Sequence, residues 1–204
     1  MKKLTLLVLL ALPYPYATQG QENLDPEAIF SSSYTLEAEE NYQEAFEVLA
    51  SIYDPASYEL NLRLGWLSYL NGEYPASRDY YSRAVGLFPY AIEAKLGYVL
   101  PVAAQGNWNE VVEIYNQILK IDPQNTLVNY RMGLISYERG EYEAAFHYVE
   151  KVVNLYPFDY DSVILFAWIH LKMGDFRKAE VLFKKSLLIY PGNESANEGL
   201  LLIQ

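Results

Sequence analysis

The stretch YERGEYEAAFHYVEKVVNLYP, residues 137–157, decides the fold, because the chain contains its pattern four times. Each copy has a glycine, an aromatic residue two positions later, a run of small and apolar residues, and a closing proline. The other copies begin at Tyr69, Ala103 and Leu171. The glycines recur every 34 residues, and so do the aromatic residues and the prolines. A period held by three kinds of position predicts one structural unit repeated along the chain.

Each copy predicts the turn between two helices and the end of the second helix. A glycine ends a helix at low cost because it adopts the left-handed conformation without strain from a Cβ atom. The closing proline cannot donate a backbone hydrogen bond to the preceding turn, so it stops the second helix. Apolar residues lie between them at helical spacing, as in Tyr142, Ala145, Phe146, Val149, Val152 and Val153. These features predict antiparallel hairpins that stack to share one core.

The pattern resembles the tetratricopeptide repeat over residues 26–204. The small residue of the family's first helix is similar to Gly65 and Gly133, and the alanine of its second helix to Ala145 and Ala179. The resemblance implies an all-α fold, an α-solenoid of antiparallel helix hairpins forming a right-handed superhelix. It implies four repeats, at residues 58–91, 92–125, 126–159 and 160–193.

The two ends of the array depart from this pattern. Residues 21–57 predict an N-terminal segment with a degenerate first repeat, in which Glu39 and Glu40 stand where the turn glycine is expected. Asp25 and Pro26 predict a helix start, as a capping residue followed by proline. Residues 194–204 predict a short helix that caps the last hairpin, since its apolar end needs a contact.

Pro101 lies inside the first helix of the second full repeat, and the period continues through it. A proline within a helix removes one hydrogen bond, so we expect this helix to be kinked or shortened. The kink is either a tolerated irregularity or a local widening of the concave face that admits a ligand.

Residues 1–20 predict a secretory signal peptide. Lys2 and Lys3 precede the apolar run LTLLVLLAL, and small residues follow at Ala17 and Gly20, after either of which cleavage fits. The apolar run is shorter than the roughly 20 residues of a membrane-spanning helix, and no later segment is long and apolar enough. The short basic region is typical of bacterial export signals. We therefore expect an exported protein, periplasmic or secreted, with no membrane span in the mature chain.

Charge and motifs exclude several classes of function. The net charge of −11 disfavours nucleic acid and anionic lipid as partners. The chain has no cysteine, and we expect His147 and His170 to lie at the surface or the groove edge. Neither belongs to a metal-binding spacing, and no nucleophile or phosphate-binding motif is present. The sequence therefore predicts a protein that is not an enzyme and needs no cofactor or metal.

The candidate binding surface is the concave groove. The resemblance implies that positions 2, 5, 9 and 12 of each repeat face this groove, and helical spacing puts them on one stripe. The Lys and Asn residues with which some family members clamp a peptide carboxylate are absent. Aromatic residues and two arginines remain, and aromatic residues anchor protein interfaces. The candidate groove residues are Arg63, Trp66, Tyr69, Tyr130, Arg131, Tyr137 and Trp168.

Several interpretations of this groove stay open. Trp66 and Trp168 lie either in the groove or in the core between repeats. The function favoured by the sequence is an adaptor or scaffold of the bacterial cell envelope that binds a peptide or helix of a partner protein. The alternative is a receptor that uses the aromatic groove to bind a small ligand or a glycan. A third possibility is an array that self-associates through its ends.

Overall fold

The computed structural model describes residues 25–203, and every regular element in that range is an α-helix. The helices are α1 (Pro26–Ala38), α2 (Tyr42–Ala50), α3 (Tyr58–Leu70), α4 (Tyr74–Leu87), α5 (Ile92–Ala104), α6 (Trp108–Ile121), α7 (Thr126–Glu138), α8 (Tyr142–Leu155), α9 (Tyr160–Lys172), α10 (Phe176–Ile189) and α11 (Glu194–Leu201). Consecutive helices pair as hairpins from α1–α2 to α9–α10, and α11 packs against α9 and α10. The prediction of an all-helical array of hairpins is confirmed.

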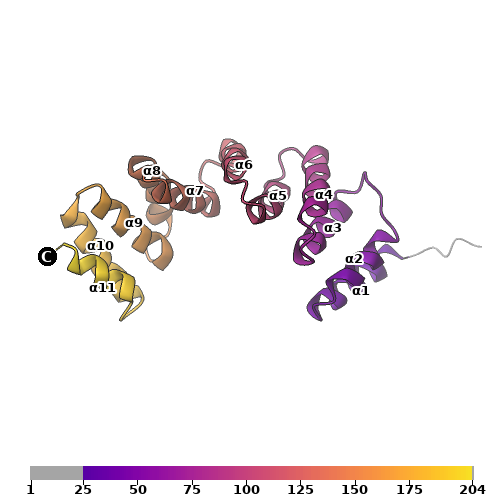
Figure 1. Cartoon of the computed structure of the whole chain (residues 1–204), viewed down its shortest axis with the longest axis horizontal. Coiled ribbons are helices and arrows are strands. Elements are labelled where there is room, and N and C mark those ends of the chain that lie inside the picture. The colour runs from indigo at the N-terminus through magenta and orange to yellow at the C-terminus, as the bar shows by residue number, and fades with distance from the viewer. Residues whose placement is uncertain (1–24, 204) are drawn as a thin grey trace, which may run out of the picture.

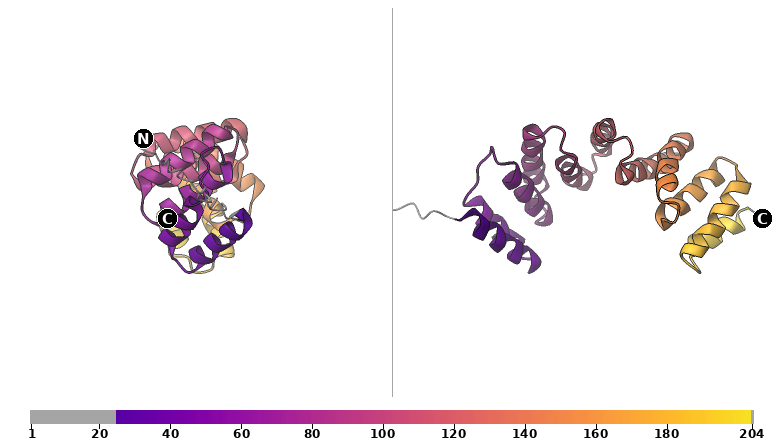
Figure 2. Two further views of the ribbon diagram at one scale, coloured as in Figure 1. Left: turned by 90° about the vertical axis from the view of Figure 1, so that its right-hand side faces the viewer. Right: turned by 180° about the vertical axis from the view of Figure 1, so that it is seen from behind.

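The hairpins are arranged as an arch (Figure 1). The α1–α2 hairpin and α11 lie at its two ends, and α5 to α8 lie at its top. Seen from one end, the successive hairpins overlap within a compact outline, whereas the view from behind repeats the arch (Figure 2). The molecule is therefore a single curved row of hairpins, and neighbouring hairpins supply each other's core.

The turn glycines have the left-handed conformation that their positions predict. Their φ angles are 78° at Gly72, 75° at Gly106 and Gly140, and 81° at Gly174. The residue after each glycine donates back to a carbonyl of the first helix, as Glu141 does to Ser136 over 2.9 Å. This bond satisfies a carbonyl that the helix end would leave without a partner.

The degenerate repeat makes the same turn without glycine. Glu40 has a φ angle of 62° and is the only described non-glycine residue with a positive φ. The N–H of Asn41 donates to the carbonyl of Leu36 over 2.9 Å, which reproduces the bond of the regular turns. The α1–α2 hairpin is therefore built like the others, at the cost of backbone strain at one glutamate.

Small residues allow the hairpins to approach closely. A Cβ atom at Gly97 would lie only 2.1 Å from the ring of Tyr81, and one at Gly65 would lie 3.0 Å from the same ring. Tyr81 of α4 is therefore held between α3 and α5. Gly133 makes a similar approach to Val149 in the third full repeat. The Tyr81 ring thus fills the space between the successive first helices α3 and α5, and the Gly133 contact brings α7 and α8 together within one hairpin.

Pro101 does not shorten its helix, so that part of the expectation is wrong. Helix α5 has 13 residues, as α3 and α7 do. Pro101 is buried, and its carbonyl still accepts the N–H of Gln105 over 3.1 Å. Packing of the proline ring and the hydrogen bonds on either side of it maintain the helix through the residue.

Helix α11 packs on the last hairpin. Its Ser195 hydroxyl accepts the indole N–H of Trp168 over 2.8 Å. A Cβ atom at Gly199 would lie 2.2 Å from the ring of Phe183, so the helix backbone rests directly on that buried ring. The apolar residues Leu200 and Ile203 pack against the same core.

The predicted signal at residues 1–20 lies outside the described residues. Over residues 25–203 the structure contains no helix of the length and hydropathy that a membrane crossing requires.

Candidate functional site

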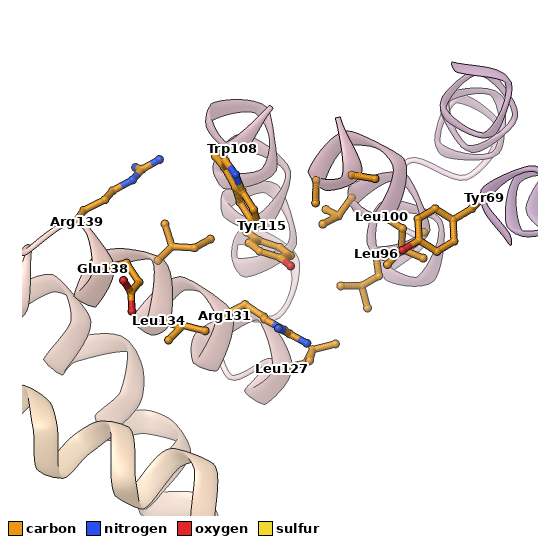
Figure 3. A pocket seen from close by; sticks show the side chains of 15 residues that line it. Tyr69, Leu96, Leu100, Trp108, Tyr115, Leu127, Arg131, Leu134, Glu138 and Arg139 are labelled. Atoms are coloured by element: carbon orange, nitrogen blue, oxygen red, sulfur yellow. The ribbon is translucent and has the colours of Figure 1, made fainter. Parts of the chain in front are cut away.

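A pocket of about 710 Å³ lies between α5, α6 and α7, with Tyr69 of α3 at one edge (Figure 3). Its wall is largely aliphatic and aromatic. The lining residues are Tyr69, Leu96, Gly97, Val99, Leu100, Ala103, Ala104, Trp108, Tyr115, Leu127, Arg131, Leu134, Ile135, Glu138 and Arg139.

The pocket exists because the array is loosely packed at this point. Helices α6 and α7 pack against each other less than α4 and α5 or α8 and α9 do. Helices α5 and α7 also approach each other less than α3 and α5. The second full repeat carries Ala103 where the first carries Tyr69, so its side chains do not fill the resulting space.

The stripe predicted from the repeat positions supplies much of the pocket wall. Five groove positions of α5 and α7 contribute aliphatic side chains: Leu96, Leu100, Ala103, Leu127 and Leu134. Two of the candidate groove residues, Tyr69 and Arg131, also line the pocket. The stripe missed Trp108 and Tyr115, which come from the second helix α6. Tyr115 has the same repeat position as Tyr81, which packs against two glycines. The lack of glycines at the equivalent positions is the only sequence feature that distinguishes Tyr115 from Tyr81.

Arg63 and Trp66 lie outside this pocket and contact the first hairpin. The Arg63 guanidinium pairs with the Glu37 carboxylate over 2.6 Å and lies 4.0 Å above the ring of Tyr34. The indole N–H of Trp66 donates to the other Glu37 oxygen over 2.7 Å. Both residues therefore hold α1 against α3.

Trp168, Tyr130 and Tyr137 pack against the core of the last two repeats. The Trp168 ring meets the edge of Phe183 at a centroid distance of 5.1 Å. Burial raises the pKa of the Tyr130 and Tyr137 hydroxyls, since it disfavours the phenolate. These three residues are partly buried, and the pocket does not include them.

Arg131 differs from Arg63 in its surroundings. It is exposed, and within residues 25–203 it makes no ion pair or side-chain hydrogen bond. The close-up shows it extending from α7 beneath the ring of Tyr115 (Figure 3). Burial raises the pKa of the Tyr115 hydroxyl, and the charge of Arg131 partly opposes that rise. The guanidinium therefore acts electrostatically on the pocket while keeping its hydrogen-bond donors available.

The two histidines lie in different environments. His147 is exposed, as expected, but His170 has only 7% of its surface exposed, so the expectation of a surface residue is wrong there. Its ring packs between Phe146 and Phe166, and its Nδ1 lies 3.1 Å from a carboxylate oxygen of Asp175. Burial lowers the pKa of His170, while Asp175 opposes the shift. A signal was available in the sequence, because the same repeat position holds only small or apolar residues, Ser68, Val102 and Ser136, all of which the structure buries.

The pocket is suited to binding. Among residues 25–203, no group of His, Cys, Asp and Glu side chains could hold a metal ion. The pocket offers apolar surface, aromatic rings and the guanidiniums of Arg131 and Arg139, neither of which makes an ion pair within residues 25–203. Such a surface can hold an apolar side chain and orient an anionic group beside it.

Comparison with protein families finds the tetratricopeptide repeat at residues 30–92, 128–159 and 160–193. These matches leave out the repeat that contains Pro101 and all the pocket-lining residues of α5 and α6. Proteins with this repeat mediate binding of proteins and peptides, and the repeat scaffold is typically non-catalytic. No curated protein matches the chain.

Solved structures share the fold at low sequence identity. A tetratricopeptide repeat protein from Parabacteroides merdae superposes with a TM-score of 0.74 at 18% identity, over 87% of this chain and 72% of that one. YrrB, a repeat protein with an unusual peptide-binding site, has a TM-score of 0.68 at 12% identity, over 85% and 91% of the two chains. MamA from Desulfovibrio magneticus has a TM-score of 0.65 at 18% identity, over 74% and 85%.

Proposed function

Because the chain belongs to the tetratricopeptide repeat family, we propose that it is a non-enzymatic adaptor that holds a peptide or helix of a partner protein. The observation that carries the proposal is the apolar pocket of about 710 Å³ between α5, α6 and α7. Partly exposed aromatic and aliphatic side chains gathered in one concave place are the usual anchors of a protein interface. Tyr69, Leu100 and Leu134 provide such anchors here.

The candidate groove residues divide into two roles within this proposal. Tyr69 and Arg131 contact the partner. The others support the groove from behind, because their side chains contact α1, α11 or the core of the last two repeats. The supporting residues are Arg63, Trp66, Tyr130, Tyr137 and Trp168.

Replacing Tyr69 tests the pocket as the partner site. Cross-linked capture from the native cell, followed by mass spectrometry, is expected to enrich the same partner with the wild-type protein in every replicate. Tyr69→Ala removes a pocket ring, and truncating an interface anchor typically costs about 2 kcal/mol, more than tenfold in affinity. We therefore expect capture to fall at least tenfold. The melting temperature should fall modestly, because the half-buried Tyr69 ring also contacts the rings of Trp66 and Tyr74.

Tyr90→Ala is the matched control. Tyr90 is 82% exposed in the loop between α4 and α5, outside the pocket lining. Tyr90→Ala removes the same type of side chain as Tyr69→Ala and should leave capture unchanged. Equal capture by wild type and Tyr69→Ala would exclude the pocket as the partner site. Failure to capture any reproducible protein would contradict the adaptor function itself.

The alternative function is a receptor for a small ligand or a glycan. The pocket volume lies within the roughly 300–1,000 Å³ of small-molecule sites, and Trp108, 52% exposed, offers a ring for stacking. Neutral hydrogen-bonding side chains that could recognise sugar hydroxyls are few in the wall, which favours the adaptor. A thermal shift with sugars that disappears in Trp108→Ala, without any captured protein, would favour the receptor.

We further propose that the adaptor works in the bacterial cell envelope, as a periplasmic or secreted protein. Support comes from the basic and apolar pattern of residues 2–12. N-terminal sequencing of protein from fractionated cells should place the mature start near Gln21. Protein that retains Met1 in the cytosolic fraction would contradict export.

A further inference from the structure

Arg63 and Arg131 occupy the same position of two repeats, two repeats apart, in contrasting surroundings. All three groups that contact Arg63 come from α1. They are the Glu37 carboxylate at 2.6 Å, the Tyr34 ring at 4.0 Å and the Ser33 hydroxyl at 3.3 Å. The molecule thus contains one example of what a guanidinium at this position binds.

The equivalent groups are missing in front of Arg131. Tyr42 and Tyr74 mark equivalent helix starts in the degenerate and first full repeats, and later repeats follow at intervals of 34 residues. On this alignment Ser33, Tyr34 and Glu37 correspond to Val99, Leu100 and Ala103 of α5. All three residues line the pocket together with Arg131. The pocket therefore lies where α1 places a hydroxyl, an aromatic ring and a carboxylate against Arg63.

We propose that this pocket recognises a segment of the partner protein carrying an aromatic residue and an acidic residue one helical turn apart. The acidic side chain pairs with Arg131, and the aromatic side chain enters the apolar space beside Leu100. This inference rests on the proposed adaptor function and deepens it by naming the chemistry of the partner segment. Tyr34 and Glu37, three residues apart on α1, supply the template.

The local charge of the pocket suits such a segment. Its charged lining residues are Arg131, Glu138 and Arg139, which leaves an excess of one positive charge in a chain whose net charge is −11. Arg131 is exposed in the free protein, but a segment that lies against the largely apolar wall would shield it from water, so its carboxylate is attracted more strongly than at an open surface. An acidic partner segment is therefore drawn to this place and repelled by most of the remaining surface.

A peptide from the chain itself provides the probe. The acetylated and amidated peptide FSSSYTLEAEE, residues 30–40, carries the same aromatic and acidic pair without terminal charges. In the whole protein α1 already occupies Arg63 at high effective concentration, so an added peptide reports on Arg131. The isolated peptide is too short to form a stable helix, so we expect weak binding. Binding is therefore followed by fluorescence anisotropy at protein concentrations up to the millimolar range.

The expected result is saturable binding to the full protein that weakens at least tenfold in Arg131→Gln. The peptide variants Tyr34→Ala and Glu37→Gln should each weaken binding in the same way. Arg177→Gln is the matched control, because Arg177 is exposed on α10 and outside the pocket lining. It should bind the peptide like the wild type. Melting temperatures should be unchanged in both protein variants, since both arginines are exposed.

Three outcomes would overturn the proposal. They are absence of binding by the parent peptide, equal binding to Arg131→Gln, and equal binding of the Glu37→Gln peptide. The cellular capture experiment separates this failure from that of the adaptor function. Capture that depends on Tyr69 but not on Arg131 would leave an adaptor with a different recognition chemistry. Peptide binding without any captured protein would support the recognition site and contradict the adaptor function.

Discussion

Gly140 shows how one residue determines a hairpin. Its φ angle is 75°, and a Cβ atom there would meet nothing within 4 Å, so backbone conformation alone requires glycine. Gly140→Val is expected to lower the free energy of unfolding by about 1–3 kcal/mol, because a β-branched residue is strained at positive φ. Urea denaturation measures the loss.

Gly86→Ala is the control for this substitution. Gly86 lies within α4, where an added Cβ atom would meet nothing within 4 Å, and its φ angle is ordinary. Alanine should leave stability unchanged or raise it by up to about 1 kcal/mol. A stable Gly140→Val variant would mean that the turn tolerates a side chain, and that other contacts determine the hairpin.

Buried His170 predicts that acid destabilises the last hairpin. Burial lowers its pKa from the ordinary value of 6.5, so the folded protein binds this proton more weakly than the unfolded chain does. The stabilising contribution is complete above about pH 6.5 and is lost as the pH falls towards the lowered pKa. Asp175, Glu150 and Lys178 act on the same ring, the two carboxylates opposing the shift and the lysine adding to it.

Melting curves at pH 7.5 and pH 5.5 measure this contribution. His170→Gln is expected to lose less stability between the two pH values than the wild type does. His147→Gln changes an exposed histidine and should keep the wild-type difference. A difference that is equal in all three proteins would remove His170 as the source.

Residue environments were predictable where local rules apply. The turn glycines followed from the chain's own conformational preferences, which depend on a few neighbouring residues. The pairing of Arg63 with Glu37 did not, since the two residues lie on different hairpins joined by an irregular junction. The prediction of a surface position for His170 was wrong because it relied on the polarity of histidine and not on the repeat position. The aromatic rings around His170 accommodate a neutral imidazole.

At the scale of the element, α5 is a helix that lacks one of its internal backbone hydrogen bonds. Pro101 leaves the carbonyl of Gly97 without the N–H that an ordinary residue would provide. Pro101→Ala restores this bond and improves helix propensity by about 3 kcal/mol, against roughly 1 kcal/mol for the lost ring burial. We expect the melting temperature to rise, with a gain of about 1–2 kcal/mol.

Pro75→Ala is the matched substitution for this test. Pro75 lies in the first turn of α4, where its missing N–H has no helical partner to lose. It should bring no comparable gain. A Pro101→Ala variant that melts at or below the wild-type temperature would show that ring packing outweighs the missing bond.

Helices and their order were predictable because glycine, proline and apolar spacing repeat with one period. The fate of α5 was not, because its continuation through Pro101 depends on burial against neighbouring helices. The pocket was also beyond the repeat frame. Its volume reflects how far apart α5 and α7 lie, a property of packing that no single position in the sequence specifies.

At the scale of the whole molecule, cohesion is uneven along the array. Helices α6 and α7 pack least among the junctions between successive hairpins. Amides of α6 and of the first turn of α7 should therefore exchange with deuterium sooner than those of α9 and α10. Hydrogen exchange followed by mass spectrometry resolves these segments. Slowest exchange in α6 would contradict this distribution of stability.

The loose junction between α6 and α7 lies at the crown of the arch, with a long arm of hairpins on either side (Figure 1). A small rotation there is multiplied by the length of each arm, so it changes the span between α1 and α11 more than the same rotation near an end. A side chain bound between α5 and α7 would determine that rotation. The pocket would then act as a hinge point, at which one bound side chain changes the distance between the two ends of the molecule.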